Sequence, residues 1–178
     1  MIIRKLFKFE GAHVVRNCSS VRCRENIHGH SYVVEVFIES DRLDRGYMVM
    51  DFTLLDRVKL LVDSFDHTYS LWEGEPDDFK AFIRRYNRRV AEIPVSPSAE
   101  GYALLFFYLI DRVLLHTDFR NGESGVRLRA VRVHETATGY AEASRDDLAL
   151  VRFTAADVRF SPGVRADWDG EEWWDALN

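Results

Sequence analysis

Three histidines stand at the ends of two segments with strand-like alternation, and their spacing suits a metal ion. His28 and His30 flank Gly29, and the two-residue period of a strand puts both imidazoles on one face. His13 ends the preceding alternating segment, which could pair alongside. Three neutral imidazoles with an open fourth position are typical of catalytic zinc. The alternative is half-buried strand histidines with hydrogen-bond partners, and the spacing leaves both interpretations open.

The two cysteines, Cys18 and Cys23, lie in a polar, irregular segment before His28. Two cysteines are too few for a disulfide framework. A thiol beside a metal and positive charge has a lowered pKa and can act as a base or nucleophile. Cys23 could instead be a fourth metal ligand that makes the site structural, and each cysteine could be an inert small residue. The spacing does not decide between Cys18 and Cys23.

Asp66 and His67 form a candidate orienting pair, because a carboxylate beside an imidazole fixes the ring and raises its basicity. Adjacent residues rarely bond each other directly, so each is expected to point at a third group. The alternative is a helix end, where a cationic residue lies near the negative end of the helix dipole.

Glu135 continues the apolar face of a strand that carries Val131 and Val133, where a carboxylate needs a partner. One partner is an amidine-like ring edge, since a carboxylate accepts two parallel N–H bonds. The other is one of the many arginines. Glu100 opens a helix, and its charge can simply stabilise the helix N-terminus.

An α+β fold would position these residues. Alternation and helical spacing predict strands over residues 1–14, 28–39, 126–136 and 139–143, and helices over about 51–65 and 96–116. This ββααββ order favours an antiparallel four-stranded sheet with two main helices on one face. We expect a core over residues 1–143 with a helical insertion at about 69–95. The extension over 144–178 carries Trp168, Trp173 and Trp174, which suggest docking onto the core or a neighbouring subunit.

Composition excludes several classes of protein. The chain has 178 residues, of which 47% are hydrophobic, so one domain with a real core is expected. A net charge of −5 disfavours non-specific nucleic-acid binding. No apolar run approaches the roughly 20 residues that span a bilayer, and the first residues lack a signal-peptide pattern. We therefore expect a soluble, cytoplasmic protein with neither a membrane nor a nucleic-acid partner.

Taken in order, these residues resemble the 6-pyruvoyltetrahydropterin synthase and 6-carboxytetrahydropterin synthase family over about residues 3–142. Each motif is weak alone, but the ordered set is specific. The matching segments are Phe9-Glu10-Gly11-Ala12-His13, Cys23 before His28-Gly29-His30-Ser31-Tyr32, Met50-Asp51-Phe52, Phe65-Asp66-His67, Pro97-Ser98-Ala99-Glu100 and His134-Glu135-Thr136.

The resemblance implies a tunnelling fold (T-fold), in which subunits join their sheets into a ring. These rings stack as a homohexamer, a dimer of trimers, with sites at subunit interfaces. It implies that Zn²⁺ is bound by three ligands, namely His13, His28 and His30. The implied catalytic residues are Cys23 as base or acid and Asp66 with His67 as a relay. The implied substrate-binding residues are Glu135, which would hold the pterin edge, and Glu100.

The implied activity is a zinc-dependent carbon–carbon lyase reaction. It converts 7,8-dihydroneopterin triphosphate to 6-carboxy-5,6,7,8-tetrahydropterin, releasing acetaldehyde and triphosphate, on the way to queuosine. The alternative within the family is 6-pyruvoyltetrahydropterin synthase, a phosphorus–oxygen lyase that eliminates triphosphate. Two alternatives of other classes are a non-catalytic pterin-binding protein and a structural zinc domain in which Cys23 completes the three histidines.

Overall fold

The sheet is built around two long antiparallel strands that carry the three histidines. The computed structural model describes residues 1–177. Its strands are β1 (Ile2–His13), β2 (His28–Glu39), β3 (Thr68–Trp72), β4 (Val90–Ile93), β5 (Arg127–Thr136), β6 (Gly139–Ser144) and β7 (Arg159–Phe160). They form one sheet in the order β6-β5-β2-β1-β3-β4-β7. The first four of these, β6-β5-β2-β1, are antiparallel and correspond to the predicted sheet.

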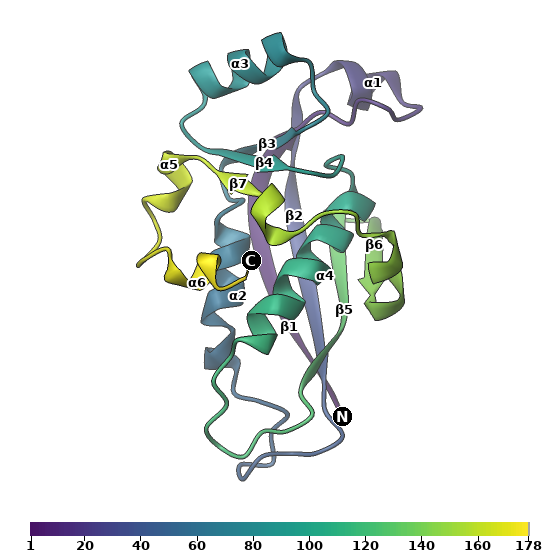
Figure 1. Ribbon diagram of the computed structural model, residues 1–178. Helices are drawn as coiled ribbons and strands as arrows, with labels where there is room; N and C mark the ends of the chain where they lie inside the picture. Colours follow the sequence, from purple (N-terminus) through teal and green to yellow (C-terminus); the bar gives the residue numbers. More distant parts are fainter. Residues whose placement is uncertain (178) are drawn as a thin grey trace.

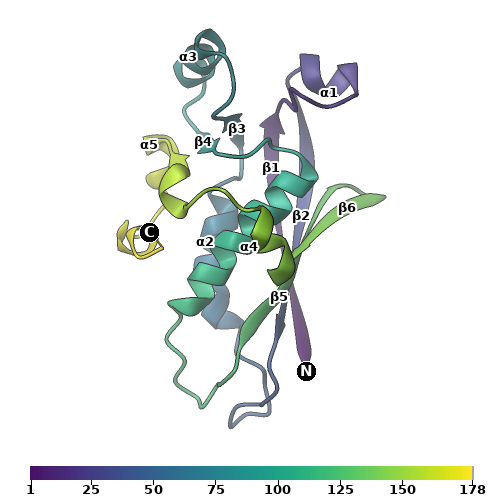
Figure 2. The same ribbon diagram turned by 45° about the vertical axis from the view of Figure 1, so that its right-hand side comes forward.

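Helices cover one face of this sheet, as Figure 2 shows for α2 and α4. The α-helices are α1 (Val21–Glu25), α2 (Asp56–Asp63), α3 (Asp77–Tyr86), α4 (Ala99–Leu115), α5 (Pro162–Arg165) and α6 (Glu172–Asp175), and the 3₁₀ helices are η1 (Phe52–Leu55), η2 (Arg145–Leu150) and η3 (Ala155–Asp157). Within residues 1–177, no helix combines the length and apolar character that crossing a membrane requires.

Alternation along β1 and β2 gives the sheet an apolar face toward these helices. Phe9 and Tyr32 stack with their ring centroids 4.6 Å apart, and both are buried. Val34, Val36 and Ile38 continue the same face of β2 and are also buried. The histidines occupy the end of this face, because the two-residue period that buries Tyr32 also sets the direction of His28 and His30.

Helix α4 is apolar on most of its circumference, which is typical of a helix with protein on more than one side. Its first turn begins after Ser98, whose Oγ accepts the Gly101 N–H at 3.1 Å. This start lies slightly later than the one expected at Ser96-Pro97. One side of the helix packs on the sheet, and the buried residues of the C-terminal segment belong to the same core.

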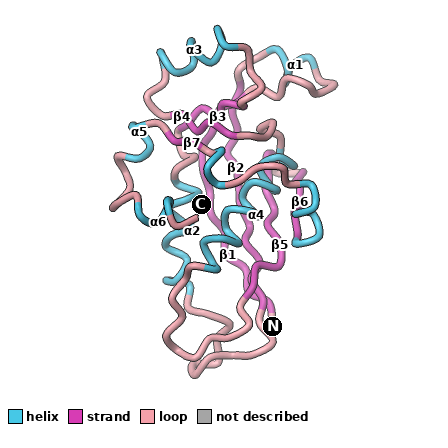
Figure 3. Tube along the Cα trace, in the orientation of Figure 1, coloured by secondary structure: helices cyan, strands magenta, loops and turns pink. Residues whose placement is uncertain are grey.

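Residues 68–93 contain more than the predicted helix. Helix α3 is present, but β3 and β4 flank it and extend the sheet beyond β1 (Figure 3). Strand β3 pairs with β1 in parallel, with Gly11 opposite Thr68, and β4 pairs with β3 in parallel. The predicted strand number was therefore too low. Both strands are short, and their pairing depends on an edge of β1 that a local pattern does not reveal.

The C-terminal segment packs against the main core, and Figure 1 shows α5 beside β4 and β7 and α6 beside α2. Strand β7 pairs antiparallel with β4 at one edge of the sheet. Phe160 is buried, and its ring lies 5.4 Å from that of Phe65 and 5.2 Å from that of Trp174. Trp168 and Trp173 pack against each other with centroids 5.0 Å apart. These aromatic residues give the segment a docked position on the subunit itself.

The anchoring role of Phe160 predicts a selective loss of stability. Phe160→Ala should lower the free energy of unfolding by about 3–5 kcal/mol, because it removes a buried ring and leaves a cavity. Leu150→Ala is the matched control, since Leu150 lies in the same segment but is 64% exposed, and it should change stability by less than about 0.5 kcal/mol. Urea unfolding of both variants measures this. Equal losses in the two would contradict the prediction.

Candidate active site

The three predicted histidines meet at one end of the sheet. His13 and His28 are directly opposite each other across β1 and β2, and His30 is two residues further on. The Nε2 atoms of His13 and His28 are 3.1 Å apart, and one ligand atom from each ring lies within 4.8 Å of the others. Zinc–nitrogen bonds of about 2.0–2.1 Å place tetrahedral ligand atoms roughly 3.4 Å apart. The cluster therefore has the dimensions of a metal site.

Two backbone carbonyls orient these rings. The Nδ1 of His13 lies 2.6 Å from the Pro97 carbonyl oxygen, and the Nδ1 of His28 lies 2.9 Å from that of Asn26. A ring nitrogen that donates to a carbonyl leaves the other nitrogen, Nε2, with a free lone pair for a metal. Sequence analysis missed both partners, because every residue has a carbonyl and no side-chain pattern marks the ones that matter.

Burial keeps His13 neutral. The side chain is fully buried, and this loss of solvent lowers its pKa from 6.5 to about 4. Its bond to the Pro97 carbonyl opposes the shift, and the nearby His28 and His30 add to it. A neutral imidazole is the form that binds a metal. His13 is thus ready to act as a ligand at neutral pH.

Glu135 borders the histidine cluster. Its Oε1 lies 3.5 Å from Nε2 of His13 and 3.7 Å from Nε2 of His30, and its side chain is partly exposed. The pairing of β5 with β6 is irregular between His134 and Thr136, so Glu135 sits at a β-bulge. A bulge redirects a side chain next to a site. Among the described residues, the basic side chains within 4 Å of its carboxylate are these two histidines and no arginine.

Asp66 and His67 bond each other directly, which corrects the expectation that each would point at a third group. His67 Nδ1 lies 2.8 Å from Asp66 Oδ2. The contact is possible because His67 has φ of 52°, a left-handed conformation rare outside glycine. Burial would raise the pKa of Asp66, but the hydrogen bonds from the Glu10 N–H and His67 outweigh it and lower that pKa. The imidazole of His67 is 74% exposed.

His67 and His30 both line a shallow depression of about 430 Å³ that also includes Glu10 and Tyr69. The structure therefore places His67, from a different part of the sequence, along the same depression as His30. The connection is β3, which pairs with β1 immediately after His67. His67 N–H donates to the Glu10 carbonyl at 2.7 Å.

The cysteines lie on the loop between β1 and β2. Cys23 is in α1 and half-buried, and its carbonyl accepts the Val15 N–H at 3.0 Å. The Cys18 thiol donates to the Ser20 carbonyl at 3.3 Å. In the part of the chain that the structure describes, the metal-ligand group contains the three histidines and neither thiol. A four-ligand site that includes Cys23 is thus not the arrangement seen.

Glu100 is exposed in the first turn of α4, two residues after the capping Ser98. This position suits the helix-stabilising interpretation of its charge. Glu100 follows Pro97 by three residues, and the carbonyl of Pro97 orients His13.

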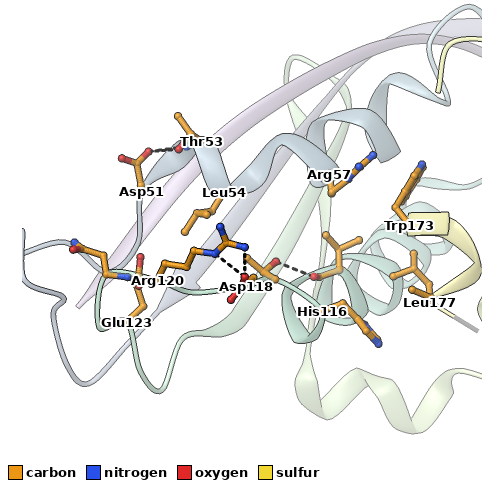
Figure 4. A pocket seen from close by; sticks show the side chains of 14 residues that line it. Asp51, Thr53, Leu54, Arg57, His116, Asp118, Arg120, Glu123, Trp173 and Leu177 are labelled. Atoms are coloured by element: carbon orange, nitrogen blue, oxygen red, sulfur yellow. Dashed lines mark hydrogen bonds and ion pairs between the residues drawn. The ribbon is translucent and has the colours of Figure 1, made fainter. Parts of the chain in front are cut away.

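A separate cavity of about 580 Å³ lies at the C-terminal end of α4, whereas Pro97, which bonds His13, lies just before its N-terminal end (Figure 4). Arg57, His116 and Trp173 line it, together with Arg120 and Asp118, which form an ion pair. Its lining, drawn from residues 51–177, includes none of the predicted site residues. The predicted site residues therefore lie outside this cavity.

Comparison with known proteins shows the family of this chain. A family model described as 6-pyruvoyl tetrahydropterin synthase matches residues 2–146, and the chain belongs to this family. A 6-carboxy-5,6,7,8-tetrahydropterin synthase of Helicobacter pylori strain J99 is 42% identical over 179 residues, covering 98% of this chain and 90% of that protein. One of Aquifex aeolicus is 31% identical, covering 79% of this chain and 95% of that protein. The predicted family and enzyme class, a lyase, are confirmed.

Solved structures support the fold. An uncharacterized protein of Wolinella succinogenes has a TM-score of 0.62 at 21% identity, covering 82% of this chain and 98% of that chain. A 6-pyruvoyl tetrahydropterin synthase of Plasmodium vivax has a TM-score of 0.57 at 21% identity, with the same coverage. The predicted tunnelling fold is confirmed. The Helicobacter relative, by its 98% coverage, shares most of the C-terminal extension as well.

The burial of His13 predicts how the stability of the metal-free protein depends on pH. Its pKa is about 4 in the folded state and 6.5 for an exposed histidine, so the unfolded state binds more protons between these values. The free energy of unfolding should therefore fall by up to about 3 kcal/mol as the pH decreases from 6.5 to 4.

Urea unfolding of the metal-free protein across this range measures the slope. His13→Gln should flatten it, since glutamine does not titrate but can still donate to the Pro97 carbonyl. His116→Gln is the control, because His116 is exposed and lies outside the histidine cluster. An unaltered slope in His13→Gln would assign the pH dependence to other groups.

Proposed function

We propose that the chain is a zinc-dependent 6-carboxy-5,6,7,8-tetrahydropterin synthase. The observation that carries the proposal is the cluster of His13, His28 and His30 beside Glu135, in a chain 42% identical to a protein of that name. We further propose 7,8-dihydroneopterin triphosphate as the substrate, with acetaldehyde and triphosphate as the other products. The proposed setting is queuosine biosynthesis in the cytoplasm.

Zinc suits the donor set. The carbonyls of Pro97 and Asn26 each bond one ring nitrogen, in His13 and His28, and one ligand atom from each of the three rings lies within 4.8 Å of the others. Three imidazoles leave room in the coordination sphere for substrate oxygens. A bound zinc ion would polarise hydroxyl oxygens of the substrate side chain and make the adjacent C–H bonds more acidic.

Glu135 is the proposed anchor for the pterin ring. Its carboxylate can accept two parallel N–H bonds from the ring edge, which fixes both position and orientation. Because Oε1 lies within 4 Å of two of the proposed zinc ligands, a ring edge bound there would lie next to them. Glu100 is a second proposed substrate-binding residue at the start of α4.

Asp66 and His67 are the proposed proton relay. Asp66 occupies Nδ1 of His67, so Nε2 is left to accept or donate a proton. Asp66 stays ionised, because its hydrogen bonds lower its pKa, and it can stabilise the protonated ring. Cys23 is the proposed second acid–base group, which would act on another face of the substrate.

A homohexamer with sites at subunit interfaces is part of the proposal. The His67 ring is 74% exposed and lies at the surface of the subunit. Such exposure is expected of a catalytic group that completes its site against a neighbouring copy. The same arrangement would place the extension near a subunit boundary.

The product assay tests the central proposal and separates it from its alternatives. The zinc-loaded protein is incubated with 7,8-dihydroneopterin triphosphate, and the products are identified by mass. We expect 6-carboxytetrahydropterin together with acetaldehyde. His28→Ala should lose both the zinc and the activity. A pyruvoyl product alone would indicate the sister enzyme, and pterin binding without turnover would indicate a non-catalytic protein.

Matched cysteine variants test the assignment of the thiol. Cys23→Ala should lower kcat by about 10²–10⁴-fold, the usual contribution of a positioned acid–base group, and should retain zinc. Cys18→Ala should keep kcat within about twofold, because its thiol bonds only the local Ser20 carbonyl. Steady-state kinetics with metal analysis measures both. A reversed pattern would assign the role to Cys18.

A further inference from the structure

The peptide group between Asp66 and His67 is held from two sides. Its N–H, which belongs to His67, donates to the Glu10 carbonyl at 2.7 Å. Its carbonyl, which belongs to Asp66, accepts from Nε of Arg89 at 3.1 Å. His67 has φ of 52°, a conformation that is strained outside glycine. It persists only where neighbours constrain it, and these two bonds provide that constraint.

This peptide sets the direction of the His67 ring. Asp66 Oδ2 bonds the ring at 2.8 Å, and Oδ1 of the same carboxylate accepts the Glu10 N–H at 2.8 Å. Rotation of the peptide would move the ring away from the carboxylate or break a bond to Glu10. Arg89 holds the carbonyl of that peptide and therefore acts on the imidazole through the backbone.

The rest of the Arg89 guanidinium is held by the C-terminal extension. Its Nη1 donates to the Gly163 carbonyl at 3.0 Å and also pairs with the carboxylate of Asp167. The planar guanidinium can serve three acceptors at once, which a lysine ammonium on a flexible stem does not reproduce. Both partners lie beyond residue 146, where the family model ends. Figure 1 shows α5, which contains Gly163, beside β4, which follows Arg89.

The extension also makes hydrogen bonds to residues before Asp66 and after Arg89. Trp168 Nε1 donates to Ser64 Oγ at 2.9 Å, just before Asp66 in the chain. Ser161 exchanges hydrogen bonds with Val90, the residue after Arg89, at 2.9 and 3.0 Å. A side chain at Gly163 would place its Cβ only 2.3 Å from the Arg88 carbonyl oxygen. The absence of a side chain there allows the close approach that brings the Gly163 carbonyl to Arg89.

From these contacts we infer that Arg89 is a positioning residue for the His67 imidazole, and that the C-terminal extension holds Arg89 in place through Gly163 and Asp167. The inference rests on the proposed role of Asp66 and His67 as the proton relay. In this inference, residues of the insertion and of the extension act together on the position of the His67 ring. The insertion supplies the guanidinium, and the extension supplies two acceptors that fix it.

The experiment compares Arg89→Met, Arg89→Lys and Asp167→Asn in the zinc-loaded full chain. Arg89→Met should lower kcat by about 10–100-fold with KM within about threefold, because the relay is misplaced while the proposed zinc and pterin contacts remain. Arg89→Lys should restore only part of kcat, and Asp167→Asn should show a smaller loss. The backbone amide of His67 should exchange hydrogen at least about tenfold faster in Arg89→Met.

Arg84→Met is the matched control. Arg84 belongs to the same insertion and makes a two-pronged ion pair with Glu92 at 2.7 and 2.9 Å. Its removal should leave kcat within about twofold and the His67 amide exchange unchanged. Zinc content and thermal unfolding of every variant identify any general loss of structure.

A double variant separates the inference from the proposed relay. In a His67→Ala background, Arg89→Met should cause no further loss of kcat, since the group it positions is absent. A further loss by the same factor, or an unchanged His67 amide exchange in Arg89→Met, would overturn the positioning role. Full activity in His67→Ala would overturn the relay itself. A defect in His67→Ala with normal turnover and exchange in Arg89→Met would overturn only the positioning role.

Discussion

The register between β1 and β2 places His13 opposite His28, and the geometry of the site depends on that pairing. A slip of one residue would send the side chains of β2 to the other face of the sheet. His28 and His30 would then leave His13, and Tyr32 would leave the core. Gly29 supports this register, because a Cβ there would lie only 2.8 Å from the Gly11 carbonyl oxygen. The packing that buries Tyr32 thus also assembles the histidine cluster.

Helix α4 connects the core to the chemistry of the cluster. The segment before it supplies the Pro97 carbonyl that orients His13, and its buried face holds the apolar side of the sheet in place. Burial beneath this junction keeps His13 neutral, which a metal ligand requires. Stability and ligand chemistry are therefore linked, since the desolvation that suits a metal ligand also makes protonation of His13 costly in the folded protein.

Two of the candidate side chains lie where the backbone departs from regular structure. Glu135 sits at a bulge in β5, and His67 takes a left-handed conformation at the start of β3. Such features concentrate where side chains must be aimed rather than packed. The insertion and the extension stabilise the second of them through Arg89. The extension, which lies beyond the residues that the family model matches, thereby contacts a residue within them.

Much of the fold could be predicted from the sequence because its main signals are local. Alternation located the four antiparallel strands, helical spacing located α2 and α4, and the ordered motifs identified the family and the candidate residues. Strands β3, β4 and β7 could not be found in this way, because each is short and is stabilised by pairing with a distant segment. The direct bond between Asp66 and His67 was missed because it depends on a single unusual φ.

The sequence by itself determined which side chains are available and on which face of each strand they lie, since the two-residue period is a property of the backbone. Only the tertiary structure decided which groups meet. It brought Glu135 to the histidines, the Pro97 carbonyl to His13, and Arg89 to the peptide before His67. These contacts join residues far apart in the chain, and their geometry is set by packing of whole elements rather than by local conformational preference.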